Sequence, residues 1–237
     1  MYNLAITSDS YVANSAPKAI IFDLYGTLLK FNQRAFLNEM IFTFNRNDNQ
    51  NFRIELKRLL LKSYSSEADM YQDWCKAFGV ESPEANEISM CNGIIQKYIS
   101  EISLYCGVRT LLSFLRRKGI KLALLSNSAQ IFTAPIKTLD LEKYFDHISF
   151  SCTTGVPKPD TISYLSVCKE LGISPEDCLF IGDSYQNDYL APISIGMSAL
   201  CLQHQSIEDK TIPTDLTLVA FSFLNQSITP LKQLIPS

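Results

Sequence analysis

Short runs of mostly apolar residues recur along the chain, and the three strongest end abruptly at a polar or acidic position. These runs are residues 18–22, which end at Asp23, residues 120–125, which end at Ser126, and residues 178–181, which precede Gly182 and Asp183. Weaker runs of the same kind cover residues 147–150 and 198–202. Strands that are apolar at nearly every position are typical of a parallel sheet buried between two layers of helices.

Helical patterns separate these predicted strands, and each is followed by a glycine. Residues 108–118 precede Gly119, residues 159–171 precede Gly172, and residues 185–195 precede Gly196. In the second of these segments, Ile162, Leu165 and Cys168 are the apolar positions that we expect to face the core. The repeated order of strand, helix, glycine and strand predicts an α/β fold with a doubly wound, Rossmann-like parallel sheet.

The long interval between the first two strong runs has a different pattern. Apolar residues recur there at steps of three and four positions, as in Ile88, Cys91, Ile95 and Ile99, which predicts helices. We therefore expect an α/β core formed by residues 17–31 and 108–237, with an all-helical insertion at residues 32–107. Residues 1–16 read as a leader that is partly disordered, and the apolar stretch 216–224 as a last strand or helix of the core.

Composition and charge exclude several classes of protein. The chain has 237 residues, of which 46% are hydrophobic and 19% charged, and its formal net charge is −3. This is typical of a globular protein, without the strongly basic surface of most nucleic-acid-binding proteins. The sequence has no apolar run near the roughly 18 residues of a membrane span, and residues 1–15 do not resemble a secretory signal. We expect neither a nucleic-acid nor a membrane partner.

The cysteines indicate a reducing compartment. There are seven, an odd number, and they contain no C-x-x-C pair. This distribution argues against a disulfide framework or a zinc site and favours reduced thiols in the core of a cytoplasmic protein.

Residues suited to chemistry follow the three strongest predicted strands. In a parallel sheet, ligands bind beyond the carboxyl ends of the strands, where the strand order reverses. The pattern places Asp23, Ser126 and Asp183 at three such ends. Lys158 precedes a predicted helix in which Pro159 suits the first position. A carboxylate, a hydroxyl and an ammonium group in one crevice can supply the nucleophile, the donors and the charge that phosphoryl transfer needs.

Four short motifs occur in a fixed order along residues 18–202. They are F-D-L-Y-G-T-L from Phe22, L-L-S-N from Leu124, G-V-P-K-P-D from Gly155 with Tyr164 after it, and G-D-S-Y-Q-N-D from Gly182 with Gly196 and Met197 after it. In this order and spacing they resemble the motifs of the haloacid dehalogenase-like hydrolase superfamily. The insertion after the first motif resembles the helical cap of one subgroup.

The resemblance implies a role for each polar residue of the motifs. Asp23 would be the nucleophile that forms an aspartyl-phosphate with a small phosphorylated metabolite, and Lys158 would stabilise both Asp23 and the transferring group. The transferring group would be contacted by residues of the first three motifs, namely Gly26, Thr27, Ser126, Asn127 and Lys158. Mg²⁺ would be held by four residues of the first and fourth motifs, namely Asp23, Tyr25 through its backbone carbonyl, Asp183 and Asp188. Elementary electrostatics agrees, because crowded carboxylates repel each other and a hard cation relieves that repulsion.

Tyr25 departs from the phosphatase pattern of the superfamily. Phosphatases of the superfamily usually have a second aspartate there as general acid and base, and a phenol with an ordinary pKa of about 10 replaces it poorly. Haloacid dehalogenases typically have tyrosine, since halide leaves without a proton. A metal-independent 2-haloacid dehalogenase and a weakly catalytic protein that binds a phosphate ligand are therefore alternatives. We favour a Mg²⁺-dependent phosphatase, since Asp183 and Asp188 have no use in metal-free dehalogenation.

Other conspicuous residues have simpler interpretations. The basic residues of the insertion recur at helical spacing and favour a solvated face over an anion clamp; they are Arg53, Lys57, Arg58 and Lys62. Asp160 reads as a first-turn helix charge, and His147 and His204 as structural or surface residues. We assign Trp74 and the other aromatic residues of the insertion to the core of a helical bundle.

Overall fold

The structure is a computed structural model that describes residues 17–44 and 50–202 of the chain. The predicted leader, the apolar stretch 216–224 and His204 lie outside the described residues, so the interpretations given for them stay predictions. No helix within the described ranges is both long enough and apolar enough to cross a membrane.

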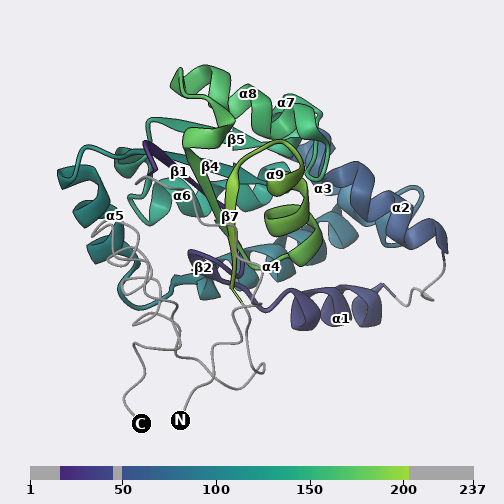
Figure 1. Cartoon of the computed structure of the whole chain (residues 1–237). Coiled ribbons are helices and arrows are strands. Elements are labelled where there is room, and N and C mark those ends of the chain that lie inside the picture. Colours follow the sequence, from purple (N-terminus) through teal and green to yellow (C-terminus); the bar gives the residue numbers. More distant parts are fainter. Residues whose placement is uncertain (1–16, 45–49, 203–237) are drawn as a thin grey trace, which may run out of the picture.

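A parallel sheet forms the centre of the described chain (Figure 1). Its strand order is β5-β4-β1-β6-β7. The strands are β1 (Ala19–Phe22), β4 (Lys121–Ser126), β5 (His147–Phe150), β6 (Cys178–Gly182) and β7 (Ser198–Cys201). The five strands expected at the apolar runs between residues 18 and 202 are confirmed. The chain adds β4 and β5 on one side of β1 and β6 and β7 on the other, so the carboxyl ends of β1, β4 and β6 are neighbours at the point of reversal.

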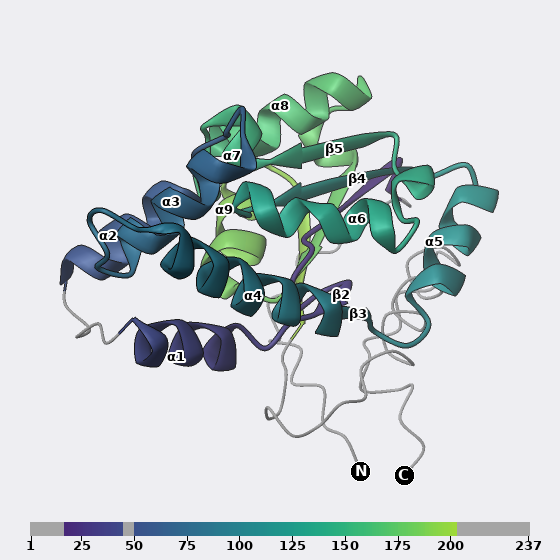
Figure 2. The ribbon, with the colours of Figure 1, turned by 180° about the vertical axis from the view of Figure 1, so that it is seen from behind.

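Helices cover both faces of this sheet because successive strand residues point to opposite sides. Ile20 and Phe22 belong to a core shared with α5 (Val108–Arg117) and α6 (Ala134–Thr138). Ala19 and Ile21 belong to a second core shared with α8 (Thr161–Leu171) and α9 (Ala191–Ser194). Figure 2 shows α6 in front of β4, on the face opposite to α9. The two-layer covering explains why the strands are apolar throughout.

The position and the buried face of α8 differ from the prediction. Asp160 is the N-cap, and its side chain accepts a hydrogen bond of 2.9 Å from the N–H of Ile162. The helix therefore begins at Thr161, and the assignment of Pro159 to its first position is wrong. Ile162 is 60% exposed and Leu165 43% exposed. Contrary to the prediction, these two side chains therefore do not face the core. The helix instead buries the face that carries Tyr164, Val167, Cys168 and Leu171.

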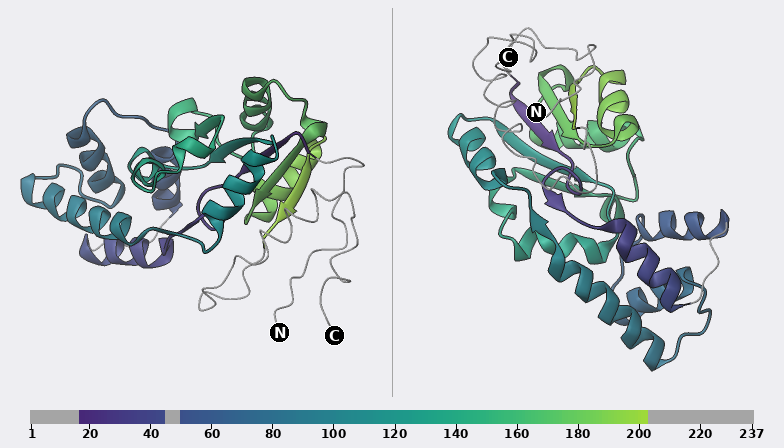
Figure 3. Two further views of the ribbon diagram at one scale, coloured as in Figure 1. Left: turned by 90° about the vertical axis from the view of Figure 1, so that its left-hand side faces the viewer. Right: turned by 90° about the horizontal axis from the view of Figure 1, so that it is seen from below.

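The helices of the predicted insertion lie between residues 33 and 101, and in sequence between β1 and β4. They are α1 (Gln33–Thr43), α2 (Gln50–Leu59), α3 (Glu67–Ala77) and α4 (Ala85–Glu101). Side chains cap three of these helices: Asn32 accepts from the N–H of Ala35 at the start of α1, Ser66 accepts from the N–H of Asp69 at the start of α3, and Glu84 and Glu87 form a capping box at the start of α4. Figure 3 shows these helices gathered beside the sheet. The predicted helical character of this interval is confirmed.

Two short strands flank the insertion, and the sequence pattern did not indicate them. β2 (Leu29–Lys30) and β3 (Ser103–Leu104) pair in antiparallel fashion. Two residues are too few to show an alternating pattern, and the pairing forms only because the chain returns to its starting point. The pair brings both ends of the insertion together next to the core.

The remaining described elements are short. The predicted helix at residues 185–195 is instead divided into a π-helical segment, η4 (Tyr185–Leu190), and α9, with Pro192 just after their junction. The others are α7 (Ser151–Thr154), η1 (Gln130–Thr133), η2 (Glu142–Tyr144) and η3 (Pro175–Asp177). The cysteines are unpaired and mostly buried, as expected, although Cys106 is exposed.

Candidate active site

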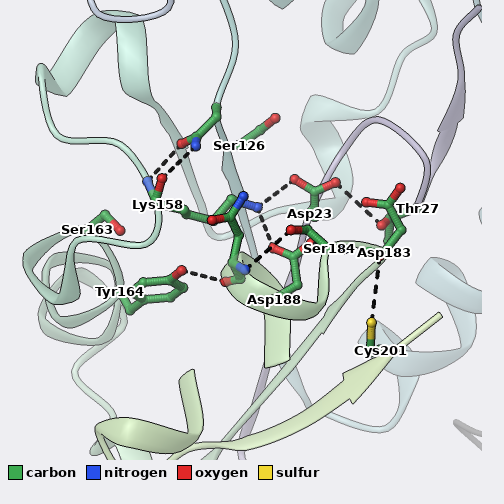
Figure 4. A network of polar contacts seen from close by, with 12 residues as sticks. Asp23, Thr27, Ser126, Lys158, Ser163, Tyr164, Asp183, Ser184, Asp188 and Cys201 are labelled. Atoms are coloured by element: carbon green, nitrogen blue, oxygen red, sulfur yellow. Dashed lines mark hydrogen bonds and ion pairs between the residues drawn. The ribbon is translucent and has the colours of Figure 1, made fainter. Parts of the chain in front are cut away.

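Three neighbouring strands bring their terminal polar residues to one edge of the sheet (Figure 4). Asp23 follows β1, Ser126 ends β4, and Asp183 follows β6. The backbone N–H of Asp23 donates a hydrogen bond of 2.9 Å to the carbonyl of Ile181, which fixes Asp23 directly at the strand end. The edge predicted from the apolar runs therefore does gather these residues.

Lys158 lies at the centre of this group although it is 30 residues from Asp188 of the fourth motif and 135 from Asp23. Its ammonium Nζ lies 2.7 Å from Oδ1 of Asp23 and 2.6 Å from Oδ1 of Asp188. All three side chains are buried. Because a buried charge needs a partner, the two carboxylates and the ammonium stabilise each other's charged forms.

Asn127 holds the backbone of Lys158 in place. Its side-chain Oδ1 accepts from the N–H of Lys158, its Nδ2 donates to the carbonyl of the same residue, and both distances are 2.8 Å. The predicted contact of Asn127 with the transferring group stays a prediction. The amide of Asn127 acts in the structure as a positioning group for Lys158.

The carboxylates at this edge have perturbed proton affinities. Burial, together with repulsion from Asp188 and Asp183, raises the pKa of Asp23 to about 6 despite the nearby Lys158. Loss of hydration and repulsion from Asp188 likewise raise the pKa of Asp183 to about 6. Burial alone would lower the pKa of Lys158, but the charges of Asp23 and Asp188 raise it. The site therefore holds a charged ammonium group among carboxylates that repel one another.

The same carboxylates fit a divalent cation. Asp23, Asp183 and Asp188 each offer an oxygen, and these oxygens lie within 4.8 Å of one another. Only one ammonium, from Lys158, balances them in the immediate contacts described above, so a further positive charge would relieve the repulsion. Carboxylate oxygens are hard ligands of the kind that Mg²⁺ prefers.

Comparison with known proteins assigns the chain to a family. The model of the haloacid dehalogenase-like hydrolases, described as a hydrolase family, matches residues 17–196. The chain belongs to this family. It is therefore a hydrolase, as the four motifs predicted.

Named relatives of this haloacid dehalogenase-like hydrolase are phosphatases. It is 29% identical over 211 residues to phosphoglycolate phosphatase 1 of Pseudomonas aeruginosa, an alignment that covers 83% of this chain and 73% of the relative. The chain is 34% identical over 109 residues to phosphoglycolate phosphatase of Nitrosospira multiformis. That alignment covers 46% of this chain and only 48% of the relative.

Solved structures of the family share the fold. A haloacid dehalogenase family enzyme from Bacteroides thetaiotaomicron, solved in complex with magnesium and inorganic phosphate, superposes with a TM-score of 0.62 at 19% identity, over 81% of this chain and 97% of that one. A phosphatase of the family from Thermococcus onnurineus superposes with a TM-score of 0.56 at 19% identity, over 79% of this chain and 87% of that one. The doubly wound core with a helical insertion is thus the fold of this hydrolase.

Hydroxyl groups lie around the predicted nucleophile of the hydrolase. Oγ1 of Thr27 is 3.4 Å from Oδ2 of Asp23. Oγ of Ser126 is 2.9 Å from Oγ of Ser128, whose own N–H donates to Oγ of Ser151. Ser128 was not among the predicted site residues. Its position two residues after Ser126, a spacing at which side chains of a strand share one face, was the signal that could have found it.

Two glycines leave room for the acidic side chains. A Cβ on Gly26 would lie 2.1 Å from Oδ2 of Asp183, and Gly26 also has a φ of +84°, which favours glycine. A Cβ on Gly182 would lie 2.3 Å from Cγ of Asp188. Gly26 thus has a spatial role beside its predicted contact with the transferring group, and Gly182 is a site residue for which no role was predicted. Asp188 is further held by the N–H of Ser184, at 2.9 Å.

The phenol of Tyr25 is not directed to the carboxylates. Its hydroxyl donates a hydrogen bond of 2.6 Å to the carbonyl of Phe132 in η1. Burial and the charge of Asp23 raise the pKa of Tyr25 well above its ordinary value. The residue that departs from the phosphatase pattern therefore stays a neutral donor and forms part of the wall between core and insertion.

The basic residues of the insertion differ in their surroundings. Arg58 donates to Asp73 and Glu55, and Lys62 also lies against Asp73. Lys57 is exposed at the rim of a pocket, and the side chain of Arg53 lies outside the described residues. Trp74 is buried and stacks on Phe78, as expected for a bundle core, while His147 is half-buried on β5.

Proposed function

We propose that this hydrolase is a magnesium-dependent phosphatase that acts on a small phosphorylated metabolite through an aspartyl-phosphate. The observation that carries the proposal is the group formed by Asp23, Lys158, Asp183 and Asp188, in which a buried ammonium contacts two carboxylates and the third lies beside them. The names of the relatives, phosphoglycolate phosphatases, support the same reaction.

In the proposed first step, a carboxylate oxygen of Asp23 forms a bond to phosphorus while the bond from phosphorus to the leaving oxygen breaks. The leaving oxygen departs with the electron pair and takes a proton from solvent. Lys158 keeps Asp23 oriented and offsets the negative charge of the phosphoryl oxygens. Thr27 and Ser126 supply hydroxyl donors at the same edge. Water then forms a bond to phosphorus while the bond from phosphorus to the oxygen of Asp23 breaks, so that phosphate is released, the carboxylate is restored and a proton of the water passes to solvent.

Asp23, Asp183 and Asp188 would hold Mg²⁺, with the backbone carbonyl of Tyr25 as the further ligand implied by the motif. When bound, the ion supplies positive charge that favours approach of the phosphoryl group to a carboxylate nucleophile. The fit rests on the three clustered carboxylates and their mutual repulsion.

We also propose that the insertion, with the boundaries 32–107 given by the sequence, acts as a cap. β2 and β3 bring its two ends together, which suits a unit that moves as one body. Closure of such a cap would exclude water from the aspartyl-phosphate and select the substrate.

Tyr25 supports a second candidate, a metal-independent 2-haloacid dehalogenase. A halide leaves without a proton, so dehalogenation would not require a carboxylic acid at the position of Tyr25. The clustered carboxylates weigh against this candidate, because Asp183 and Asp188 add negative charge beside the nucleophile that metal-free dehalogenation does not need.

The deciding experiment measures phosphate release from p-nitrophenyl phosphate and phosphoglycolate, and halide release from 2-chloropropionate, with Mg²⁺ and with EDTA. We expect phosphate release that requires Mg²⁺ and is abolished by Asp23→Asn with the circular dichroism spectrum unchanged, because an amide cannot be the nucleophile but preserves the turn. If Asp23→Asn kept activity within about tenfold of the native protein, a difference of only about 1.4 kcal/mol in the barrier, Asp23 would not be the nucleophile. Halide release in the presence of EDTA would show that the protein is a metal-independent dehalogenase. Ligand binding without turnover would show that it is a binding protein.

A further inference from the structure

A pocket adjoins the candidate active site, between the insertion and the sheet edge. Its volume is about 180 Å³, and α1, α2, α3 and η1 each contribute to its wall. Tyr25 and Asn127 also line it. Because Tyr25 is two residues from Asp23 and Asn127 follows Ser126, the pocket borders the two chain segments that carry the predicted nucleophile and the hydroxyl of Ser126.

The wall of the pocket is dominated by aromatic rings. They are Tyr25, Phe31, Phe36, Trp74 and Phe132. The rings contact one another at centroid distances of 5.0 Å for Phe31 and Phe132 and 5.8 Å for Trp74 and Phe132. Such a wall offers both ring edges and ring faces to an occupant, and another aromatic ring makes the most favourable use of them.

The size and polarity of the pocket point to the same occupant. An apolar cavity of about 150 Å³ takes up benzene, and this pocket is slightly larger. Gln33 and Lys57 are exposed at its rim, whereas Leu56 and Leu60 add apolar wall. A small carboxylate would lose hydration among these side chains without a buried partner, which is unfavourable.

We propose that the substrate is a phosphate monoester whose leaving group carries an aromatic ring, and that the ring binds in this pocket. The inference rests on the proposed phosphatase activity and names its substrate class. The phosphate would bind at Asp23 and the ring in the pocket lined by Tyr25, with the ester oxygen between them. An aryl oxide is also stable as an anion, which suits a site where a phenol replaces the carboxylic acid.

The test compares benzyl phosphate with ethyl phosphate, which have the same type of leaving oxygen and differ by the ring. We expect kcat/KM to favour benzyl phosphate by about tenfold or more, because the ring is removed from water. Leu60→Trp fills the pocket and should lower the ratio to near one. The matched control Leu61→Trp changes the next residue, which is exposed and does not line the pocket, and should keep the ratio. Leu56→Trp serves in place of Leu60→Trp if that variant does not fold.

Binding of benzylphosphonate and ethylphosphonate in the presence of Mg²⁺, measured by calorimetry, separates this inference from the proposed function. Equal kcat/KM for the two esters, or an undiminished ratio in Leu60→Trp, overturns the aromatic substrate while the phosphatase stands. If no ester is hydrolysed, the proposed phosphatase activity is wrong, and the binding of the phosphonates then tests the pocket alone. Tighter binding of benzylphosphonate than of ethylphosphonate, lost in Leu60→Trp, supports a binding site for an aromatic ring. Equal binding of the two phosphonates overturns it.

Discussion

The hydroxyl of Tyr25 donates a hydrogen bond of 2.6 Å to the backbone carbonyl of Phe132. The contact joins the turn that carries the proposed nucleophile, Asp23, to η1, and both residues line the pocket described above. It also holds the phenolic proton away from Asp23. The group that replaces the usual acid therefore acts as an anchor, and the leaving group must depart without help from it.

Substitution of Tyr25 tests this account with phenyl phosphate and benzyl phosphate, an aryl and an alkyl ester that both carry a ring. We expect the native protein to favour phenyl phosphate. Tyr25→Asp should raise kcat/KM for benzyl phosphate relative to phenyl phosphate by about tenfold or more, since a general acid contributes about 10² to 10⁴ in rate. Tyr25→Phe, the control, should leave the ratio unchanged. Equal native rates on both esters, with chemistry rate-limiting, would show that another group supplies the proton.

The metal assignment predicts a change in Mg²⁺ dependence when Asp183 loses its charge. Asp183→Asn should raise the Mg²⁺ concentration for half-maximal activity by about tenfold or more, because an anionic ligand contributes more than a neutral amide to binding a dication. Asp160→Asn is the control, since asparagine also caps a helix well. Full activity in EDTA would contradict the assignment.

The contact between Gly182 and Asp188 predicts an effect of a single methyl group. Gly182→Ala would place a Cβ 2.3 Å from Cγ of Asp188, so the side chain of Asp188 or the strand that carries Gly182 must shift, which disturbs the contact of Asp188 with Lys158. We expect kcat to fall by about tenfold or more, consistent with misplacement by about 1 Å costing up to about a hundredfold. Gly93→Ala in α4, where a Cβ meets nothing within 4 Å, should leave kcat unchanged. Native activity in Gly182→Ala would show that the placement of Asp188 does not matter.

The ion pairs of Asp73 predict a pH-dependent contribution to stability. Partial burial opposes ionisation, but hydrogen bonds from Lys62, Arg58 and Tyr64 outweigh it and lower the pKa of Asp73 from 3.8 to about 2. The unfolded chain thus binds the proton more readily, so the stabilisation is present above about pH 4 and is lost as the pH falls through about 2.

Asp73→Asn should therefore lower the free energy of unfolding at pH 7 by about 1 to 2 kcal/mol, after allowance for solvent screening. In urea titrations the difference from the native protein should shrink as the pH falls below about 4. Asp69→Asn, at an exposed position of the same helix, should show a smaller effect. A difference that is constant between about pH 7 and about pH 3 would mean that the charge of Asp73 is not responsible.

The sequence alone determined the core and the main site residues. A strand buried on both faces must be apolar throughout, so each run showed where a strand ends, and in a parallel sheet those ends share one edge. The apolar runs were therefore sufficient to place Asp23, Ser126 and Asp183 together. The helices of the insertion could also be predicted, because their buried apolar residues recur every three or four positions along the chain.

Only the tertiary structure decided which groups these residues contact. Tyr25 and Phe132 are 107 residues apart, and Asn127 and Lys158 are 31 apart, so no local pattern links them. The same holds for β2 and β3, for the exposed Ile162 on α8, and for the aromatic pocket. Each depends on how separate elements pack, since a side chain's partner is fixed by the approach of distant segments rather than by its neighbours in sequence.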